Sequence, residues 1–512
     1  MTDGSRQKAI AIMGIRGVPA AHGGFETFAA QLAPYLVAHG WKVTVYCEEP
    51  TRVAPYESEW RGVRRVHIGY GPDRAINSIR FDWACIRHLL RDEARAPLVL
   101  TLGYNTAVFG LRLRLAGIAH VINMDGIEWA RSKWGPLAKA WLYLNDWGGC
   151  LGATHLMADH PEIARHLETR VDAGRISMIP YGTDLVDEAD TMPLAALGVE
   201  PGRFLTLIAR PEPENSVLEI VRAFSAKPRG CKLVVLGRYA PDAFAYHADV
   251  KRAASDEVVF PGAIYDAQVL AALRRHGLAY LHGHRVGGTN PSLLEAMGAG
   301  NAVIAHDNRF NRWVAQDGAL YFADTAGCID AIDRALADPA LCATLGRANR
   351  EAAATRFGWP LVLSQYEMTM AALHARATGH AGAPAPPLAG LKEAITEMDP
   401  TGCWRQARGH GARWPPRSSR AAWPTRWRGA STRGAVRFAS MHGAARCSRR
   451  PAPSRSSRPV ARRTWPSRTR PPPPRSCCPR PPPRRCRRRR TRSRSATSST
   501  CACPTRRSST SR

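Results

Sequence analysis

The chain has 512 residues, enough for two or three domains, and a formal net charge of +30. This charge lies at one end, because residues 401–512 hold 31 Arg and no Lys, Asp or Glu, which leaves 41 basic and 42 acidic residues in residues 1–400. A basic surface spread over the folded part, as in a nucleic-acid-binding domain, is therefore excluded.

The C-terminal segment 381–512 is rich in Arg, Pro and Ser and is predicted to be disordered. Residues 401–512 lack Leu, Ile, Asn and Tyr, so they cannot bury enough apolar surface to offset the entropy lost on folding. Three explanations stay open: an Arg-rich segment for nucleic acid or anionic lipid, a passive linker, or a GC-rich gene read out of frame (a frameshift product). The abrupt loss of seven residue types favours the third.

The chain carries no apparent export or membrane signal. Its first residues, MTDGSRQKAIAIMG, lack the apolar stretch of a signal peptide, and no run of about 18 apolar residues exists for a membrane-spanning helix. The six cysteines of residues 1–400 are scattered, which fits reduced thiols better than a zinc site or a disulfide framework. We expect a cytoplasmic protein without metal or cofactor, with peripheral contact at the inner face of the plasma membrane as an open possibility.

Residues 1–188 alternate short apolar strands with helices. A helix is predicted at 25–40, and strands are predicted at 8–14, 42–47, 97–103, 119–126 and 176–180. Alternation of this kind implies parallel strands joined by right-handed crossovers, and so a doubly wound sheet.

Residues 199–358 repeat this plan after a linker at 181–202. A helix is predicted at 216–224, and strands are predicted at 204–210, 231–237, 257–262, 278–283 and 301–307. The expected fold class is α/β, with two Rossmann-like domains facing a cleft. Ligands bind at the carboxyl ends of the strands in such folds.

Each of the two predicted domains has a glycine-rich stretch at the end of one of its strands. In MGIRGVPAAHGGFETF (13–28), Gly14 and Gly17 allow a tight turn, and Gly23 and Gly24 open the helix. Bare amides at a helix N-terminus favour an anion such as a phosphate. The spacing is neither the dinucleotide fingerprint nor a Walker loop, so an ordinary strand–helix turn stays open.

The second glycine-rich stretch is YLHGHRVGGTNPSLLEAMGAG (280–300). A helix is predicted to begin near Pro291, since proline suits a first helical turn. Glu295 would then accept two hydrogen bonds from a ribose diol, or be merely a glutamate favoured by the helix dipole. The residues whose amides or side chains are predicted to face the cleft are Gly287, Gly288, Thr289, Asn290, Ser292 and Leu293.

Four motifs together resemble one family: GIRGVPAAHGGFETF, NMDGIEWARSKW, ARPEPEN and HGHRVGGTNPSLLEA. They are similar to the GT-B glycosyltransferases of family 4, above all to a rhamnosyltransferase-like branch with a DUF1972-type N-terminal domain. The resemblance covers about residues 8–375. It implies retaining, metal-independent transfer of a hexosyl or deoxyhexosyl group from a nucleotide-sugar to a glycan or lipid-linked acceptor, in cell-surface polysaccharide synthesis. It also implies a helix at 359–378 that returns across the domains.

The resemblance assigns site residues, with two departures. Glu295 matches the family glutamate that binds ribose, but the glutamate expected eight residues earlier falls on Gly287. Arg210 matches the arginine of the diphosphate clamp, whereas the lysine five residues on is Asn215. His284 or backbone amides would replace the missing glutamate, and Arg238 or Arg285 the missing lysine.

Residues on the acceptor side are expected in domain one. Asp125 and Glu128 would orient an acceptor or a sugar hydroxyl, or else cap a helix. The stretch 128–147 holds four Trp beside Arg131, Lys133 and Lys139, which suits a membrane interface, a sugar platform or simple packing. Arg210, Asp125 and His284 are the expected catalytic residues.

Two rival functions remain at this stage. One is an inactive GT-B protein whose Arg-rich tail binds nucleic acid or an anionic membrane; the departures at Gly287 and Asn215 support it. The other is a GT-B epimerase or phosphorylase, which would turn over a nucleotide-sugar or glycan without a lipid acceptor.

Overall fold

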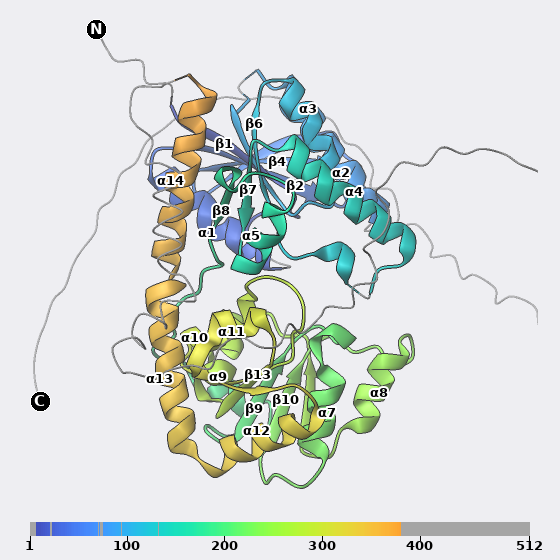
Figure 1. The fold of residues 1–512 in the computed structure, drawn as a ribbon, viewed down its shortest axis with the longest axis vertical. Coiled ribbons are helices and arrows are strands. Elements are labelled where there is room, and N and C mark those ends of the chain that lie inside the picture. The colour runs from blue at the N-terminus through green and yellow to red at the C-terminus, as the bar shows by residue number, and fades with distance from the viewer. Residues whose placement is uncertain are drawn as a thin grey trace, which may run out of the picture. The chain divides into compact units, whose positions relative to one another are not determined.

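The computed structural model describes residues 7–20, 23–69, 71, 75–93, 95–131 and 133–379. The tail predicted at 381–512 lies outside the described residues. Figure 1 shows two sheets with helices packed around them.

Residues 7–184 form an eight-stranded sheet in the order β3-β4-β2-β1-β5-β6-β7-β8. All neighbouring strands are parallel except β3, which pairs antiparallel with β4 at the edge. The strands are β1 (Ala9–Met13), β2 (Lys42–Glu49), β3 (Tyr56–Trp60), β4 (Val63–Gly69), β5 (Leu98–Leu102), β6 (Ala119–Asn123), β7 (His155–Ala158) and β8 (Ile176–Met178).

Helices cover both faces of this sheet because side chains alternate along each strand. Ile10 and Ile12 of β1 belong to a core shared with α1, whereas Ala11 and Met13 face a second core shared with α2. The helices are α1 (Gly24–Ala38), α2 (Ala75–Arg91), α3 (Gly110–Leu115), α4 (Pro136–Gly152) and α5 (Pro161–Glu168), with 3₁₀ turns at Ala107–Phe109, Glu128–Ala130 and Ala173–Arg175.

The second sheet has six parallel strands in the order β11-β10-β9-β12-β13-β14. Its strands are β9 (Phe204–Ile208), β10 (Lys232–Leu236), β11 (Val258–Gly262), β12 (Ala279–His282), β13 (Ala302–His306) and β14 (Ala319–Phe322). Its helices are α6 (Met192–Ala195), α7 (Val217–Ser225), α8 (Ala245–Ala253), α9 (Ala267–His276), α10 (Pro291–Gly298), α11 (Arg309–Ala315), α12 (Thr325–Ala337) and α13 (Pro339–Arg356), with 3₁₀ turns at Pro213–Asn215 and Gln316–Gly318. The expected class, two doubly wound α/β domains, is confirmed.

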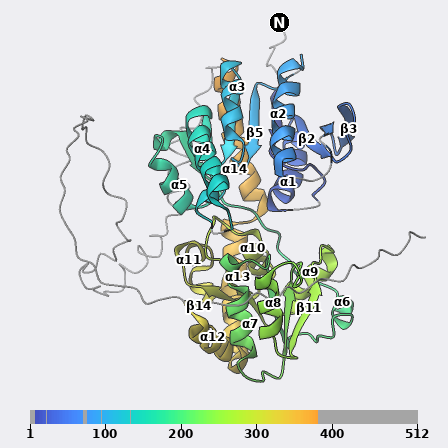
Figure 2. The same ribbon diagram turned by 90° about the vertical axis from the view of Figure 1, so that its right-hand side faces the viewer.

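The last described helix, α14 (Trp359–Ala377), leaves the second domain and packs on the first. Figure 2 shows it passing behind the strands of the first sheet. Its Tyr366 hydroxyl accepts a hydrogen bond from Asn123 Nδ2 at 3.1 Å, and Glu367 pairs with Lys8 at 2.9 Å. Within the described residues, no helix is long and apolar enough to cross a membrane.

Candidate functional site

The turn between β12 and α10 is built as the sequence predicts. Gly287 has φ +120°, a left-handed conformation that favours glycine. α10 begins at Pro291, and the Asn290 side chain caps it by accepting a hydrogen bond from Ser292 N at 3.0 Å. The Ser292 hydroxyl bonds Tyr280 Oη at 2.7 Å. Asn290 and Ser292 therefore shape the turn, and Leu293 is buried in the core.

The same turn touches domain one. A side chain at Gly288 would overlap the carboxylate of Asp159, and a Cβ on Gly126 would lie 3.0 Å from Gly287 Cα. Thr289 N–H donates to Asp159 Oδ2 at 2.8 Å, and the Thr289 hydroxyl donates to the Asp159 carbonyl. Glycines at 126, 287 and 288 thus let the two domains meet backbone to backbone.

His284 is fixed by Asn215. His284 Nδ1 lies 2.6 Å from Asn215 Oδ1, while Asn215 Nδ2 donates to the Arg210 carbonyl at 2.8 Å. Because the amide nitrogen of Asn215 is already engaged as a donor, His284 Nδ1 must carry the proton and Nε2 keeps its lone pair. Burial, helped by His282 and Arg131, holds the pKa of His284 well below its ordinary value, so the ring is neutral.

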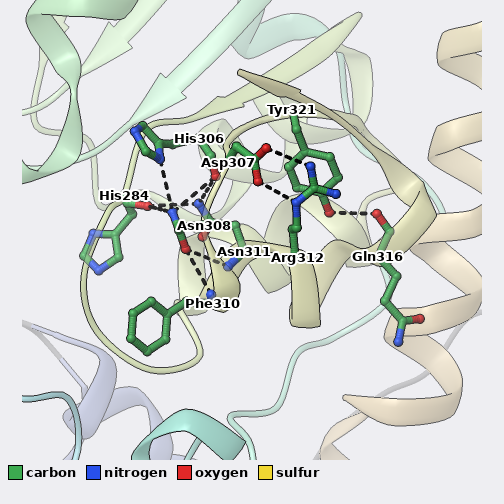
Figure 3. Close-up of polar contacts among 9 residues, drawn as sticks. All are labelled: His284, His306, Asp307, Asn308, Phe310, Asn311, Arg312, Gln316 and Tyr321. Carbon is green, nitrogen blue, oxygen red and sulfur yellow. Dashed lines mark hydrogen bonds and ion pairs between the residues drawn. The ribbon is translucent and has the colours of Figure 1, made fainter. Parts of the chain in front are cut away.

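The backbone of His284 is held by two asparagines that the sequence analysis did not single out (Figure 3). Asn308 Nδ2 and Asn311 Nδ2 each donate to the His284 carbonyl at 2.9 Å. Asn311 Nδ2 also donates to the His306 carbonyl at 2.8 Å, and Asn308 Oδ1 caps α11. These bonds tie the end of β12 to the end of β13.

Domain one contributes acids and one arginine. Asp125 is half-buried at the end of β6, and Arg131 bridges Glu128 at 2.6 Å and Glu214 of domain two at 2.9 Å. Burial, together with the charge of Glu128, raises the pKa of Asp125, while Arg131 and Arg210 oppose this shift. Glu128 is committed to Arg131 and begins a 3₁₀ turn, so Asp125 is the acid that remains for a ligand.

Arg210 follows β9 and is mostly exposed. Its side chain is 65% accessible, and its nearest carboxylate, on Glu212, is 4.0 Å away. The cation at the missing lysine position is not supplied by Arg285, whose guanidinium bonds Ser216 Oγ at 2.7 Å and Glu219 at 3.3 Å. Arg210 is thus left to contact a ligand.

The glycines of domain one have two different functions. Gly14 (φ +84°) and Gly17 (φ +136°) leave no room for a side chain against Leu102 and Cys47, so packing explains them. Gly23 is the N-cap of α1, and a Cβ on Gly24 would lie 3.1 Å from the Pro291 ring. The N-termini of α1 and α10, both with partial positive charge, therefore adjoin.

Glu295 lies on α10 and pairs with a residue that the sequence analysis missed. Arg274 Nη2 of α9 bonds Glu295 Oε2; the arginine side chain is 11% exposed and the glutamate 38%. The carboxylate is held from one side and accessible from the other.

Asp159 and Arg274 were missed, and Arg131 was expected only at the acceptor side, because each acts on a partner in another domain or on another helix. A usable signal existed for Asp159, since the apolar run HLMA ends in Asp-His-Pro at the edge of the sheet where ligands bind.

Residues 7–184 match the family described as domain of unknown function DUF1972. Residues 197–352 match the family described as glycosyl transferases group 1. A search of curated proteins found no match.

Several solved structures share the fold. Sucrose-phosphate synthase from Thermosynechococcus elongatus aligns with a TM-score of 0.63 and 21% identity, over 72% of this chain and 100% of that chain. An α,α-trehalose-phosphate synthase (UDP-forming) from Burkholderia vietnamiensis aligns with a TM-score of 0.55 and 14% identity, over 71% of this chain and 99% of that chain. HepE of Anabaena in complex with UDP aligns with a TM-score of 0.54 and 13% identity, over 71% of this chain and 99% of that chain. These are GT-B structures.

Proposed function

We propose that this chain, whose residues 7–184 match the DUF1972 family and whose residues 197–352 match the glycosyl transferases of group 1, is a glycosyltransferase. It would move a hexosyl or deoxyhexosyl group from a nucleotide-sugar to a glycan or lipid-linked acceptor. The observation that carries this proposal is the meeting of two helix N-termini, at Gly24 and Pro291. Two adjoining helix N-termini, each with partial positive charge, favour a diphosphate. HepE, a similar structure, was solved with UDP.

Glu295 is our candidate for the ribose ligand. Its carboxylate is partly exposed and is oriented by Arg274, so one oxygen is held while the group still faces outward. A carboxylate can accept hydrogen bonds from both hydroxyls of a ribose.

Diphosphate departure would be assisted by Arg210 and by the partial positive charge at the N-termini of α1 and α10. Fixed donors aimed at developing negative charge are usually the largest catalytic contribution. This arrangement provides positive charge at the phosphates from the protein itself, and the transfer is proposed to be metal-independent. His284 Nε2 lies beside the glycine turn and would accept a hydrogen bond from a hydroxyl of the transferred sugar.

The reaction is proposed to proceed with retention of configuration. The acceptor oxygen attacks the anomeric carbon on the face that the diphosphate leaves, and the leaving phosphate oxygen takes the acceptor's proton. No protein nucleophile is required. Asp125, at the end of β6 in domain one, would orient the acceptor hydroxyl.

An exposed apolar stripe on α4 supports the proposal that the acceptor is lipid-linked and lies at a membrane. On α4, Leu137, Leu144 and Leu151 are 89%, 54% and 60% exposed and recur every seven residues on one side of the helix. Leu115 of α3 is 82% exposed, and Leu111 of α3 contacts Gly152 at the end of α4. A basic residue contacts this surface, because Arg114 Nη1 donates to the Leu151 carbonyl at 2.6 Å. An amphipathic, cationic surface of this kind suits anionic lipid headgroups.

The first test is calorimetry of the full chain with UDP, GDP and dTDP. We expect one nucleotide to bind, and Glu295→Ala to weaken that binding by about tenfold to a hundredfold, the equivalent of losing a hydrogen bond to a charged group. Glu200→Ala, at an exposed glutamate on the same domain, is the matched control. A folded chain that binds none of the three would refute the transferase proposal and favour the inactive binding protein.

A further inference from the structure

Asp159 is a buried acid that the proposed mechanism does not use. It follows β7 in domain one and is 1% exposed. Oδ2 accepts the Thr289 amide at 2.8 Å, and the Asp159 carbonyl accepts the Thr289 hydroxyl. The carboxylate lies where a side chain on Gly288 would project. Domain one thus places an acid directly on the glycine turn of the nucleotide-sugar domain.

The second oxygen of this carboxylate has no partner. Asp159 Oδ1 is buried and makes no hydrogen bond to any described residue. A buried acceptor without a donor is costly, and native proteins rarely leave one unpaired. Because Thr289 fixes Oδ2, the carboxylate is oriented and Oδ1 is held at the turn.

The groups around Oδ1 define which ligand would satisfy it. Burial and the nearby Asp125 both raise the pKa of Asp159 well above its ordinary value, which disfavours its charged form. His284 Nε2 would lie 2.8 Å from a Cβ on Gly287, the neighbour of Gly288. The two carboxyl groups and the imidazole can each form a hydrogen bond with a neutral hydroxyl.

We propose that Asp159 binds a hydroxyl of the sugar being transferred, and that Gly288 is glycine because this carboxylate occupies the position of its side chain. This role rests on the proposed function, because the sugar reaches the turn as part of a donor whose ribose lies on Glu295. Asp159 is then a specificity residue that contacts the sugar and not the nucleotide. The carboxylate and the turn belong to different domains, so both contact the sugar only when the domains meet.

The experiment compares nucleotide with nucleotide-sugar. Calorimetry of the full chain measures UDP and UDP-glucose, GDP and GDP-mannose, and dTDP and dTDP-rhamnose. In Asp159→Asn, the amide oxygen can still accept from Thr289 N–H, while an amide nitrogen, which cannot accept a hydrogen bond, replaces Oδ1. We expect nucleotide affinity to stay within about twofold and nucleotide-sugar affinity to fall about tenfold or more, the loss of one hydrogen bond at a buried acceptor.

Two further variants separate binding from structure. Gly288→Ala should reproduce the selective loss, because its Cβ overlaps the carboxylate. Asp172→Asn, at an exposed aspartate of domain one, should change neither affinity. Thermal unfolding of each variant checks that it is folded.

Two results would overturn this role. If Asp159→Asn weakens nucleotide and nucleotide-sugar equally, or leaves both unchanged, Asp159 only joins the domains. If the wild-type chain binds no nucleotide, the donor site itself fails, and this role fails with it. The nucleotide measurement alone therefore tests the proposed function, and the difference between nucleotide and nucleotide-sugar tests Asp159.

Discussion

Arg274 of α9 and Glu295 of α10 form an ion pair in which the arginine is nearly buried and the glutamate is not. A buried guanidinium holds a carboxylate in one orientation, at a cost that its other hydrogen bonds must offset. Arg274 is therefore a positioning residue for the proposed ribose ligand, reaching the nucleotide only through Glu295.

Arg274→Gln is expected to weaken nucleotide binding by about 1–2 kcal/mol, because Glu295 loses its orienting partner. In the Glu295→Ala background the same change should have little further effect, since the group that Arg274 orients is gone. Calorimetry of the single and double variants measures this coupling. Arg275→Gln, on the exposed neighbour, is the control and should bind normally. Additive losses would show that Arg274 acts independently of Glu295.

Asn215 is expected to act through His284. Asn215→Ala removes the acceptor that fixes the proton on Nδ1, so Nε2 is no longer reliably an acceptor. We expect donor turnover to fall about tenfold to a hundredfold, with nucleotide affinity nearly unchanged. Release of nucleotide from the donor without acceptor is the measurement. Equal losses in turnover and nucleotide affinity would instead place Asn215 at the phosphates.

The apolar stripe of α4 predicts membrane binding that survives salt. Leu144→Glu with Leu151→Glu should reduce the affinity for phosphatidylglycerol vesicles, measured by co-sedimentation, at least a hundredfold, because burying each leucine in the membrane contributes about 1.5–3 kcal/mol. Leu185→Glu, at a leucine 40% exposed elsewhere, is the control. Binding by the Arg-rich tail should instead disappear at high salt in every variant. If the double variant co-sediments with vesicles as the wild type does, this surface does not bind the membrane.

Asp82 predicts a pH effect on stability. Burial raises its pKa to about 7, although its bond from Thr106 Oγ1 at 2.7 Å opposes the shift. The folded state therefore holds a proton that the unfolded state releases near pH 4, and stability falls as pH rises from about 4 to 7. Asp82→Asn keeps the acceptor for Thr106 and should gain stability over the wild type between pH 5 and pH 8. Urea unfolding measures this difference; a pH-independent difference would mean that Asp82 is ionised in the fold.

Much of the scaffold is predictable from local pattern. β1 and β12 are apolar runs, and α10 begins where Asn-Pro supplies both a cap and a fixed φ. β3 was missed because it is a mostly exposed edge strand, and β7 because four residues beginning with His155 give little periodicity. The two strands need their neighbours to form.

The site is less predictable than the scaffold. Glu295 and Arg210 were assigned from the resemblance to the family, and their roles stay predictions. The contact between Asp159 and Thr289 joins residues 130 positions apart, and the contact between Arg131 and Glu214 joins residues 83 apart. No spacing rule connects such pairs, since they depend on how two separately folded sheets meet.

The return of α14 onto domain one has a consequence for how the chain unfolds. The ring of Tyr366 packs at a tilt against Phe28, with centroids 4.6 Å apart, and one continuous core contains side chains of β1, α1, α10, α13 and α14. Two domains that share a core should lose their structure in a single cooperative transition, not in two. A chain cut before Trp359 would leave Phe28 without its contacts to Trp359 and Tyr366, so domain one needs residues from the C-terminal helix to be stable.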